Sequence, residues 1–273
     1  MIIDNIFSII AFIIRQKRFP NLMSPKSLTD KILLIKLKQQ SKISYLRKLA
    51  ADRIAVRDYV KSKSKNCNLI KMLWSGSELK NSDWESLPDK FVIKANHGSK
   101  MVKIVDKSKD SFKSIYDLTQ EWLVRDYYKR GREWVYKDTP RTLIVEELLQ
   151  FSDKVPPDFK FFCLNGKVSF VQVDLDRFNG HCRNIYSNRF DLLDVEYHFP
   201  RGYSIKKPSN FEDAVKISEE LSSDFDFVRV DLYLLDDGIF FGELTNFPGN
   251  CLESFDDYSF DLEVGSKLVL NHD

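Results

Sequence analysis

A short apolar hairpin in the last fifth of the chain carries acidic residues on both of its predicted strands. Residues 228–235 (VRVDLYLL) are rich in Val, Leu and Tyr, and residues 239–244 (IFFGEL) have the same apolar character. The DDG sequence between them is typical of a tight turn, so the stretch predicts a β-hairpin. Asp231 and Glu243 would lie on its two strands, and their oxygens suit a hard cation such as Mg²⁺. An ordinary hairpin with exposed polar residues remains the alternative.

Asn246 is a third oxygen donor close to this hairpin. It follows Glu243 by three residues, and side chains three apart on a strand point to opposite faces. Asn246 can therefore join the two carboxylates only if the strand bulges or ends between them. The Pro248-Gly249 pair makes a strand end reasonable. We expect Asn246 to be a conditional third metal ligand.

The order of predicted elements along the chain indicates an α+β fold. Helices are predicted over residues 27–64, 109–129 and 211–223. Strands are predicted over residues 91–95, 101–105 and 143–149, in a hairpin over 160–176 and in the hairpin over 228–244, with a short apolar run at 69–74. Neither a GxGxxG nor a Walker A sequence is present, so the usual phosphate loops are absent from the sequence.

The N-terminal part of the chain, residues 1–88, is predicted to be a helical and basic region. Residues 1–72 contain 16 Lys and Arg against four Asp, whereas the other 201 residues contain 26 basic and 36 acidic side chains. This excess predicts either an anionic partner (a membrane surface, a polyanionic glycan or a nucleotide) or a solvated helical face. No nucleic-acid-binding motif accompanies the charge, so nucleic acid is not an expected partner.

The apolar run from Ile6 to Ile14 has nine residues, far fewer than the roughly 20 that a transmembrane helix needs. Its positive charges follow the run, unlike those of a signal peptide. Two interpretations stay open: a core helix, or an interfacial helix whose basic end meets anionic lipid. The four Cys form no CxxC pair, which favours a reducing compartment. We therefore expect a cytoplasmic location, with peripheral contact at the inner face of the membrane under the second interpretation.

The stretch FVIKANHGSKMVKIV, residues 91–105, contains a second group of candidate residues. Lys94 stands near the end of a predicted strand, ahead of a small polar turn with Gly98 and Ser99. The tip of such a hairpin can cover a polyphosphate, because backbone N–H groups contact phosphate oxygens and the lysine supplies a positive charge. Lys103 on the returning strand is expected to assist. A hairpin that merely carries a lysine is the alternative.

The third stretch is LIVEELL, residues 143–149, a predicted strand that ends in two glutamates. Such a strand can connect two lobes, where backbone groups recognise the edge of an adenine ring. Paired glutamates that are simply solvated are the alternative.

Taken in order, the three stretches resemble the ATP-grasp superfamily. The ending of the chain is similar to D-alanine–D-alanine ligases, in which Arg-Val-Asp is followed by Glu, Asn and Pro-Gly, although Glu and Asn usually stand two apart there. The resemblance is closest to the TupA-like ATP-grasp family of polysaccharide biosynthesis and covers about Ser24 to Gly265. The matching stretches are KLAADRIAVRDYVKSK, LPDKFVIKANHGS, RTLIVEELL, DFKFFCLNGK, FVRVDLYLL and FGELT.

This resemblance implies an ATP-grasp fold in which two α+β lobes grip ATP with Mg²⁺. The small lobe would comprise residues 89–148, and the C-terminal lobe with the metal site would comprise residues 149–273. The implied ATP-binding residues are Lys94, Asn96, His97, Gly98, Ser99, Lys103, Glu146, Glu147, Leu148, Asp158 and Lys160, with Asp158 at the ribose. The implied metal ligands are Asp231, Glu243 and, conditionally, Asn246. Arg229 would act with Lys94 in catalysis by stabilising the transferring phosphoryl group and the oxyanion that follows.

The segment after the long hairpin, residues 173–186, is the expected acceptor side. Arg177, His181 and Arg183 are predicted to lie in a loop there. Arginine pairs with carboxylate or phosphate through two parallel hydrogen bonds, so these residues are candidate substrate contacts.

The resemblance implies an ATP-dependent carboxylate–amine ligase that forms an amide through an acyl phosphate. The expected partners are a glycan or sugar-nucleotide acceptor, such as a uronic acid of a capsular or O-antigen polysaccharide or its precursor, and an amine or amino-acid donor. A glycan phosphotransferase or a non-catalytic nucleotide-binding protein is the alternative. The HRD and DFG signatures of protein kinases are missing.

Overall fold

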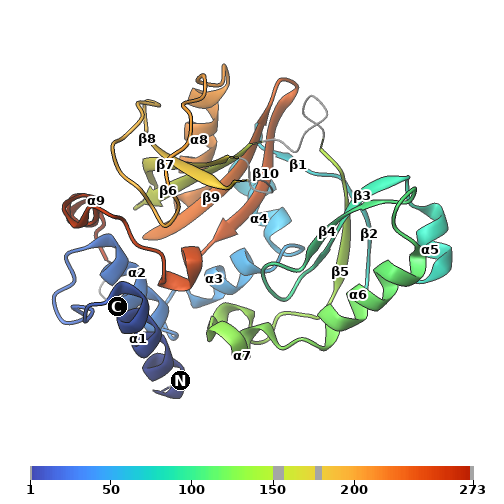
Figure 1. Cartoon of the computed structure of the whole chain (residues 1–273), viewed down its shortest axis with the longest axis horizontal. Coiled ribbons are helices and arrows are strands. Elements are labelled where there is room, and N and C mark those ends of the chain that lie inside the picture. Colours follow the sequence, from blue (N-terminus) through green and yellow to red (C-terminus); the bar gives the residue numbers. More distant parts are fainter. Residues whose placement is uncertain (1, 150–156, 176–179, 271–273) are drawn as a thin grey trace.

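The computed structural model describes residues 2–149, 157–175 and 180–270 and contains two β-sheets surrounded by helices (Figure 1). The larger, six-stranded sheet has the order β1-β10-β9-β6-β7-β8, and only the β1–β10 pair is parallel. Its strands are β1 (Asn68–Leu69), β6 (Asp158–Leu164), β7 (Lys167–Leu175), β8 (Cys182–Ser187), β9 (Phe227–Leu235) and β10 (Gly238–Thr245). The predicted α+β class is confirmed.

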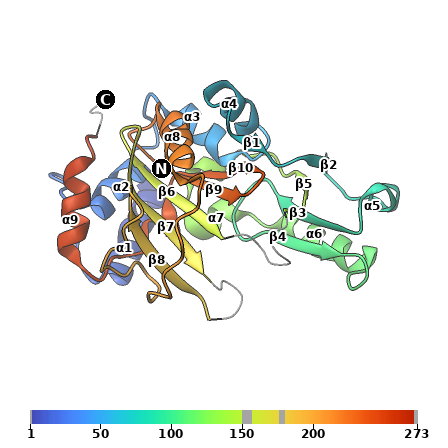
Figure 2. The same ribbon diagram turned by 90° about the horizontal axis from the view of Figure 1, so that it is seen from above.

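The smaller sheet is four-stranded and antiparallel, in the order β2-β5-β3-β4. Its strands are β2 (Met72–Gly76), β3 (Lys90–Ala95), β4 (Val102–Asp106) and β5 (Leu143–Glu147). Two views at right angles place this sheet, with α5 and α6, on one side of the molecule and the six-stranded sheet on the other (Figure 1 and Figure 2). Residues 68–76 contribute β1 to the larger sheet and β2 to the smaller one. The region 1–88, predicted to be helical, therefore also contains two strands.

The helices are α1 (Ile2–Gln16), α2 (Leu28–Leu37), α3 (Ser44–Ala51), α4 (Val56–Lys63), α5 (Asn81–Ser86), α6 (Phe112–Val124), α7 (Tyr127–Gly131), α8 (Phe211–Ser222) and α9 (Tyr258–Lys267), with 3₁₀ turns at η1 (Trp134–Tyr136) and η2 (Pro248–Cys251). The single helical stretch expected over residues 27–64 is therefore three helices. Asp52 explains one break, because its Oδ1 accepts hydrogen bonds from the backbone N–H groups of Ile54 and Ala55 at 2.9 and 3.0 Å. This is the side-chain capping that ends one helix and begins the next.

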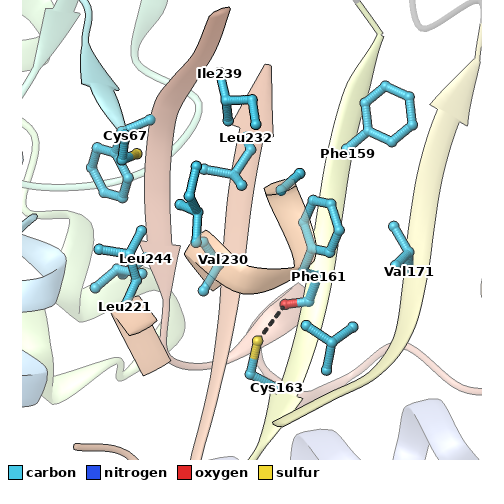
Figure 3. Packing of buried hydrophobic residues seen from close by; sticks show 14 of the residues in the cluster. Cys67, Phe159, Phe161, Cys163, Val171, Leu221, Val230, Leu232, Ile239 and Leu244 are labelled. Carbon is cyan, nitrogen blue, oxygen red and sulfur yellow. Dashed lines mark hydrogen bonds between the residues drawn. The ribbon is translucent and has the colours of Figure 1, made fainter. Parts of the chain in front are cut away.

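Strand alternation divides the six-stranded sheet into an apolar face and a second, partly charged face. Phe159, Phe161 and Cys163 on β6 point the same way as Val230 and Leu232 on β9, and Figure 3 shows them packed together. Helix α8 covers this face. Residues between them in sequence, such as Lys160 and Asp231, must point to the opposite face. The apolar core thus fixes which side chains form the charged face.

The second face is apolar only toward one end, where the N- and C-terminal helices cover it. Phe162, Phe170 and Phe227 pack there with residues of α2, α9 and η1, including Leu33, Val264 and Trp134. Helix α9 and strand β8 were not predicted, and β8 occupies part of the segment expected to be a loop.

Helix α1 contradicts the core-helix interpretation of the apolar N-terminal run. Only Asp4, Ser8 and Phe12 of α1 are buried, whereas most of its isoleucines are exposed. Within the described part of the chain, no helix combines the length and apolar character that crossing a bilayer requires.

Arg47 joins α3 to the six-stranded sheet, and only 1% of this residue is exposed. Its guanidinium forms an ion pair with Asp226 and donates from Nη1 to the carbonyl of Phe227 and to Oδ1 of Asn246, both at 3.1 Å. The N-terminal helices are therefore part of the same core as the C-terminal sheet.

Replacing Arg47 with Met should lower the free energy of unfolding by about 3–5 kcal/mol, because the buried Asp226 carboxylate loses its cation. Lys48→Met is the matched control. Lys48 pairs with Asp138 at 2.9 Å on the surface, where an ion pair contributes at most about 1 kcal/mol. Urea unfolding of both variants measures the difference, and equal losses would contradict this role of Arg47.

Candidate active site

A row of charged side chains crosses the second face of the six-stranded sheet. Glu243 on β10 lies opposite Asp231 on β9, which lies opposite Lys160 on β6. Side chains directly opposite each other on paired strands point to the same face. The two carboxylates on the hairpin therefore face the same side, as the metal-site hypothesis requires.

A β-bulge at Gly242 brings Glu243 into this row. The β9–β10 register shifts between Phe241 and Glu243, and a Cβ atom at Gly242 would lie 2.9 Å from the carbonyl oxygen of Asp231. Glycine is therefore the residue that lets the strands approach at the bulge. Beyond the bulge, Glu243 and Thr245 alternate normally opposite Asp231 and Arg229.

Asn246 does not join the two carboxylates, and its conditional assignment as a metal ligand is wrong. Strand β10 ends at Thr245, as the hypothesis allowed, but the Asn246 side chain is directed to Arg47 on α3 instead of to the carboxylates. Its Oδ1 accepts from Arg47, and its Nδ2 donates to the Arg47 carbonyl at 2.9 Å. Thr245, which sequence reasoning missed, lies beside the carboxylates instead and donates its hydroxyl to Oε1 of Glu243 at 2.7 Å.

Arg229 connects the two acidic residues. Its Nε and Nη2 donate to Oδ1 and Oδ2 of Asp231 at 2.7 and 2.6 Å, and Nη2 lies 3.5 Å from Oε1 of Glu243. Nη2 also donates to the hydroxyl of Thr245 at 3.1 Å. This fork geometry fixes the guanidinium in the plane of the Asp231 carboxylate.

The two carboxylates differ in their surroundings. Asp231 is buried, and burial raises its pKa, although Arg229 and Lys160 favour its anion. Both Asp231 oxygens accept hydrogen bonds from Arg229, which is the geometry of the ionised form. The side chain of Glu243 is 41% exposed. Burial would raise its pKa as well, but the charges of Arg53 and Arg229 outweigh that effect and lower the pKa to about 2.

The donor set fits Mg²⁺ bound together with a polyphosphate. Among the described residues, no group of three or more His, Cys, Asp or Glu side chains could hold a metal alone. Mg²⁺ is commonly bound by one or two carboxylates plus the phosphates of a substrate, which matches Asp231 and Glu243. Their roles as ligands stay a prediction.

Lys160 continues the charged row toward β7 and β8. Its ammonium contacts Asp158 and lies 3.0 Å from Oδ2 of Asp174. Burial would raise the pKa of Asp174, but Lys160 and Arg183 attract its anion and hold that pKa well below the usual value. Asp158 and Lys160 are thus close together on the charged face, and their nucleotide contacts stay predictions.

The structure corrects one predicted acceptor residue. Arg183 lies on β8 instead of in a loop, and its guanidinium binds Oδ1 of Asp174 at 2.7 Å and Oε2 of Glu253 at 3.1 Å. It is therefore occupied by protein carboxylates. His181 precedes β8 with its Nε2 3.3 Å from Asp174, and Arg177 lies outside the described residues.

On the smaller sheet, Lys94 and Glu146 are neighbours. The Lys94 ammonium lies 2.6 Å from Oε2 of Glu146, and Nη1 of Arg57 on α4 lies 3.2 Å from Oε1 of the same carboxylate. Two cations therefore share one buried carboxylate, which leaves net positive charge at this position.

A pocket between the two sheets brings these groups together. It is lined by Ala50, Ala51, Arg53, Val56, Arg57, Lys94, Tyr136, Glu146, Phe241, Gly242, Glu243 and Leu244. The predicted phosphate lysine and one predicted metal carboxylate thus line the same pocket from different sheets. Sequence reasoning missed Arg53, Arg57 and Tyr136, although the first two lie in the KLAADRIAVRDYVKSK stretch that carried the family resemblance.

Arg53 holds the loop that follows β3. Its Nη1 donates to the carbonyls of Ala95, Asn96 and Gly98 at 3.1, 3.3 and 2.7 Å. The Asn96 side chain accepts from the Arg53 backbone N–H at 2.7 Å and donates to Asp52 at 3.0 Å. The Asn96 side chain therefore positions the loop and does not point freely to a ligand.

Gly98 and Ser99 form the tip of this loop. A Cβ atom at Gly98 would lie 2.4 Å from Cγ of Tyr127, so the packing requires glycine there. The phosphate contacts of Gly98 and Ser99 stay predictions.

His97 and Lys103 do not reach the pocket. His97 is buried with its Nε2 2.9 Å from the Trp122 carbonyl on α6. Lys103 lies opposite Ile93, a core residue on the sheet face covered by α6, and pairs with Asp110 at 3.0 Å. Lys94 points to the other face of the same sheet. The assignment of His97 and Lys103 to ATP is therefore not supported by their positions.

The predicted adenine contacts lie at the end of β5. The backbones of Glu146 and Glu147 are paired within the sheet, and the Glu147 N–H donates to the Lys71 carbonyl at 3.0 Å. Leu148 comes directly after β5, so its backbone lies outside the strand pairing that involves Glu146 and Glu147. The adenine contacts of Glu146, Glu147 and Leu148 stay predictions.

The TupA-like ATP-grasp family matches residues 31–269, and the chain therefore belongs to this family. The ATP-grasp fold expected from the sequence is confirmed by this match. No curated protein sequence matches the chain.

Several solved ATP-grasp ligases resemble the chain in structure. D-alanine–D-alanine ligase from Bacillus anthracis, complexed with ATP, is 14% identical with a TM-score of 0.42, and the match covers 72% of this chain and 54% of that one. The enzyme from Helicobacter pylori is also 14% identical, with a TM-score of 0.45 and coverages of 81% and 59%. L-amino acid ligase from Bacillus licheniformis is 13% identical, with a TM-score of 0.48 and coverages of 80% and 48%. The chain thus spans about half of the length of each.

Asn246→Ala should reduce stability without removing Mg²⁺-dependent ATP binding, because Asn246 binds Arg47 and not the carboxylates. Losing its hydrogen bonds to a buried arginine should lower the free energy of unfolding by about 1–3 kcal/mol. Urea unfolding measures the loss, and isothermal titration with Mg²⁺ and ATP measures binding. Abolished binding in a folded Asn246→Ala variant would show that Asn246 belongs to the metal site.

Lys94→Ala should remove most of the thermal stabilisation that ATP gives, whereas Lys103→Ala should retain it. The two lysines lie on the same hairpin but on opposite faces of the sheet. At 100 times the Kd, a ligand stabilises the folded state by about 2.7 kcal/mol, which a melting curve resolves. Equal shifts in the two variants would show that Lys94 does not bind the nucleotide.

Proposed function

We propose that this chain is an ATP-dependent carboxylate–amine ligase that forms an amide on a uronic-acid-containing capsular or O-antigen polysaccharide, or on its precursor. The observation that carries the proposal is the pocket that Lys94 and Glu243 line from different sheets, with Arg229 and Asp231 behind Glu243. Membership of an ATP-grasp family supports ATP as the nucleotide. The glycan acceptor rests on the resemblance to polysaccharide-biosynthesis proteins.

Three cations of the pocket are suited to the triphosphate. Lys94 and Arg57 flank Glu146, and Arg53 extends from the loop at Gly98 toward Glu243, with Nη2 of Arg53 3.8 Å from Oε2 of Glu243. Phosphoryl transfer depends mainly on alignment and charge neutralisation, so fixed cations of this kind serve it directly. Bound ATP would supply the phosphoryl group, and Mg²⁺ held by Asp231 and Glu243 would neutralise phosphate charge.

Amide formation would proceed in two steps. A carboxylate oxygen of the acceptor bonds to the γ-phosphorus as the bond to ADP breaks, which gives an acyl phosphate. The amine then attacks the acyl carbon, inorganic phosphate leaves, and the nitrogen loses a proton. Arg229, held by Asp231, would present its guanidinium to the charge that develops in both steps.

Asp231→Asn and Glu243→Gln should each lower ATP turnover at least about 100-fold, because each removes a carboxylate that would hold the Mg²⁺ whose positive charge balances the transferring phosphoryl group. Asp236→Asn, at the exposed turn of the same hairpin, is the control and should turn over normally. Turnover is measured as ADP release with candidate uronic acids and amines. Near-normal turnover by either site variant, with the control intact, would exclude the proposed metal ligands.

Hydroxylamine separates the ligase from the alternative phosphotransferase. With a ligase, hydroxylamine replaces the amine and converts the acyl phosphate to a hydroxamate of the acid, which mass spectrometry detects. A phosphate ester on a sugar hydroxyl does not react in this way. ATP-dependent formation of a stable phosphosugar, with no hydroxamate, would replace the ligase by a glycan phosphotransferase.

A further inference from the structure

Helix α1 contacts the rest of the protein through the side that carries Asp4, Ser8 and the fully buried Phe12. The Tyr128 hydroxyl donates to Oδ2 of Asp4 at 2.6 Å, and Arg132 lies 3.4 Å from the same carboxylate. At the other end of the helix, Nε2 of Gln16 donates to the Glu253 carbonyl at 2.8 Å. These contacts at both ends fix which side of α1 faces the protein.

The opposite side of α1 is apolar and exposed. We call its residues the α1 apolar face: Ile2 (73% exposed), Ile3 (73%), Ile6 (52%), Phe7 (41%), Ile10 (51%) and Ile14 (72%). Their spacing of three and four residues places them on one side of the helix. Phe19 and Met23 follow at 81% and 100% exposed. These eight are half of the sixteen large apolar side chains exposed within the described ranges, and such a concentration marks an interaction surface.

The exposed charge beside this face is positive. Arg15, Lys17 and Lys26 are exposed and form no ion pair with any carboxylate of the described residues. Asp4 is the acidic residue of α1, and it is buried against Tyr128 and Arg132. An occupant of this surface must therefore accept apolar side chains and supply negative charge next to them.

We propose that the α1 apolar face binds the surface of an anionic lipid bilayer. A helix with isoleucine and phenylalanine on one side lies in the plane of the interface with those side chains among the upper acyl chains. Arg15 and Lys17, at and just beyond the end of α1, would then meet the anionic headgroups, where each positive charge strengthens binding. Figure 1 shows α1 at the edge of the molecule, away from the smaller sheet, and no residue of α1 lines the pocket.

A second copy of the chain satisfies these observations less well. Symmetric pairing through the α1 apolar face would cover the apolar side chains but would double the number of positive residues beside the interface. No acidic side chain is exposed on α1 to balance them. An anionic bilayer supplies the missing negative charge.

The test is flotation of the full chain with vesicles at low salt. Vesicles of phosphatidylglycerol and phosphatidylcholine should carry the protein, and vesicles of phosphatidylcholine alone should carry much less. Binding should weaken as salt rises from 0.1 to 1 M, because the Debye length falls from about 10 to about 3 Å. Failure to bind anionic vesicles at low salt would overturn the proposal.

Two double variants identify the surface. Ile6→Ser with Ile10→Ser should weaken vesicle binding at least about tenfold, because it replaces two isoleucines that would be buried in the bilayer. Val124→Ser with Val269→Ser removes two exposed apolar groups elsewhere and should bind like the wild type. Arg15→Gln and Lys17→Gln should each weaken binding about fivefold. Equal binding by both double variants would place the lipid contact on another surface and refute the proposal.

Two further measurements separate the other outcomes. Light scattering detects any dimer in solution. If the wild type forms a dimer but does not bind vesicles, and the Ile6→Ser with Ile10→Ser variant is a monomer, the α1 apolar face binds a second copy of the chain. Melting curves with ATP should show the same nucleotide stabilisation in all these variants, because none of the substituted residues lines the pocket. The lipid proposal and the ligase proposal can therefore fail independently.

Discussion

The buried ion pair of Arg229 and Asp231 governs how the charged half of the six-stranded sheet is arranged. A carboxylate removed from water is strongly destabilising unless a cation and hydrogen bonds accompany it. The fork of two hydrogen bonds at 2.6 and 2.7 Å meets that need within a single strand. It also fixes the strand register, because a slip by one residue would turn both charges into the apolar face under α8 and expose Val230.

The N-terminal helices complete this balance from outside the sheet. Arg47 neutralises Asp226, Arg57 shares Glu146 with Lys94, and Arg53 lies between the Gly98 loop and Glu243. The basic excess of the first 72 residues is therefore partly consumed inside the protein by the acidic excess of the rest. The remaining part includes Arg15, Lys17 and Lys26, which stay exposed beside α1. The basic N-terminal residues thus form ion pairs inside the protein and also leave positive charge on the surface beside α1.

The sequence predicted the hairpins well because their turn residues are local signals. The DDG turn and the Asn165-Gly166 turn lie at residues 236–238 and 165–166 as expected, and α8 differs from its prediction by one residue at the end. The sequence pattern predicts one helical stretch over residues 27–64 and misses the break between α3 and α4, because that break depends on Asp52 accepting hydrogen bonds from the Ile54 and Ala55 N–H groups. Strand β8 was missed because its partner β7 and the buried pair of Arg183 and Asp174 determine it.

The site itself was predictable only in part, for a related reason. Asp231 and Glu243 share a face because of the bulge at Gly242, and a glycine in a strand does not say where a bulge falls. The same bulge places Thr245 beside the carboxylates, whereas Asn246 follows the end of β10 and binds Arg47. Arg53 and Arg57 are separated from Gly98 and Glu146 by 45 and 89 residues, so only the tertiary fold brings them together. The apolar run from Ile6 to Ile14 likewise left a core helix and an interfacial helix open, because residues that contact α1, such as Tyr128 and Arg132, are distant in sequence.

The unequal exposure of the two carboxylates determines from which side a cation could enter the candidate metal site. Glu243 lines the pocket and is 41% exposed, whereas Asp231 is buried behind it with Arg229 bound to both of its oxygens. An incoming cation would meet Glu243 first. Arg229 already reaches Glu243 at 3.5 Å and Thr245 at 3.1 Å through the same nitrogen that binds Asp231. A point charge such as a lysine ammonium lacks this planar fork, so arginine is the side chain that can hold Asp231 in place and still present positive charge at the edge of the pocket.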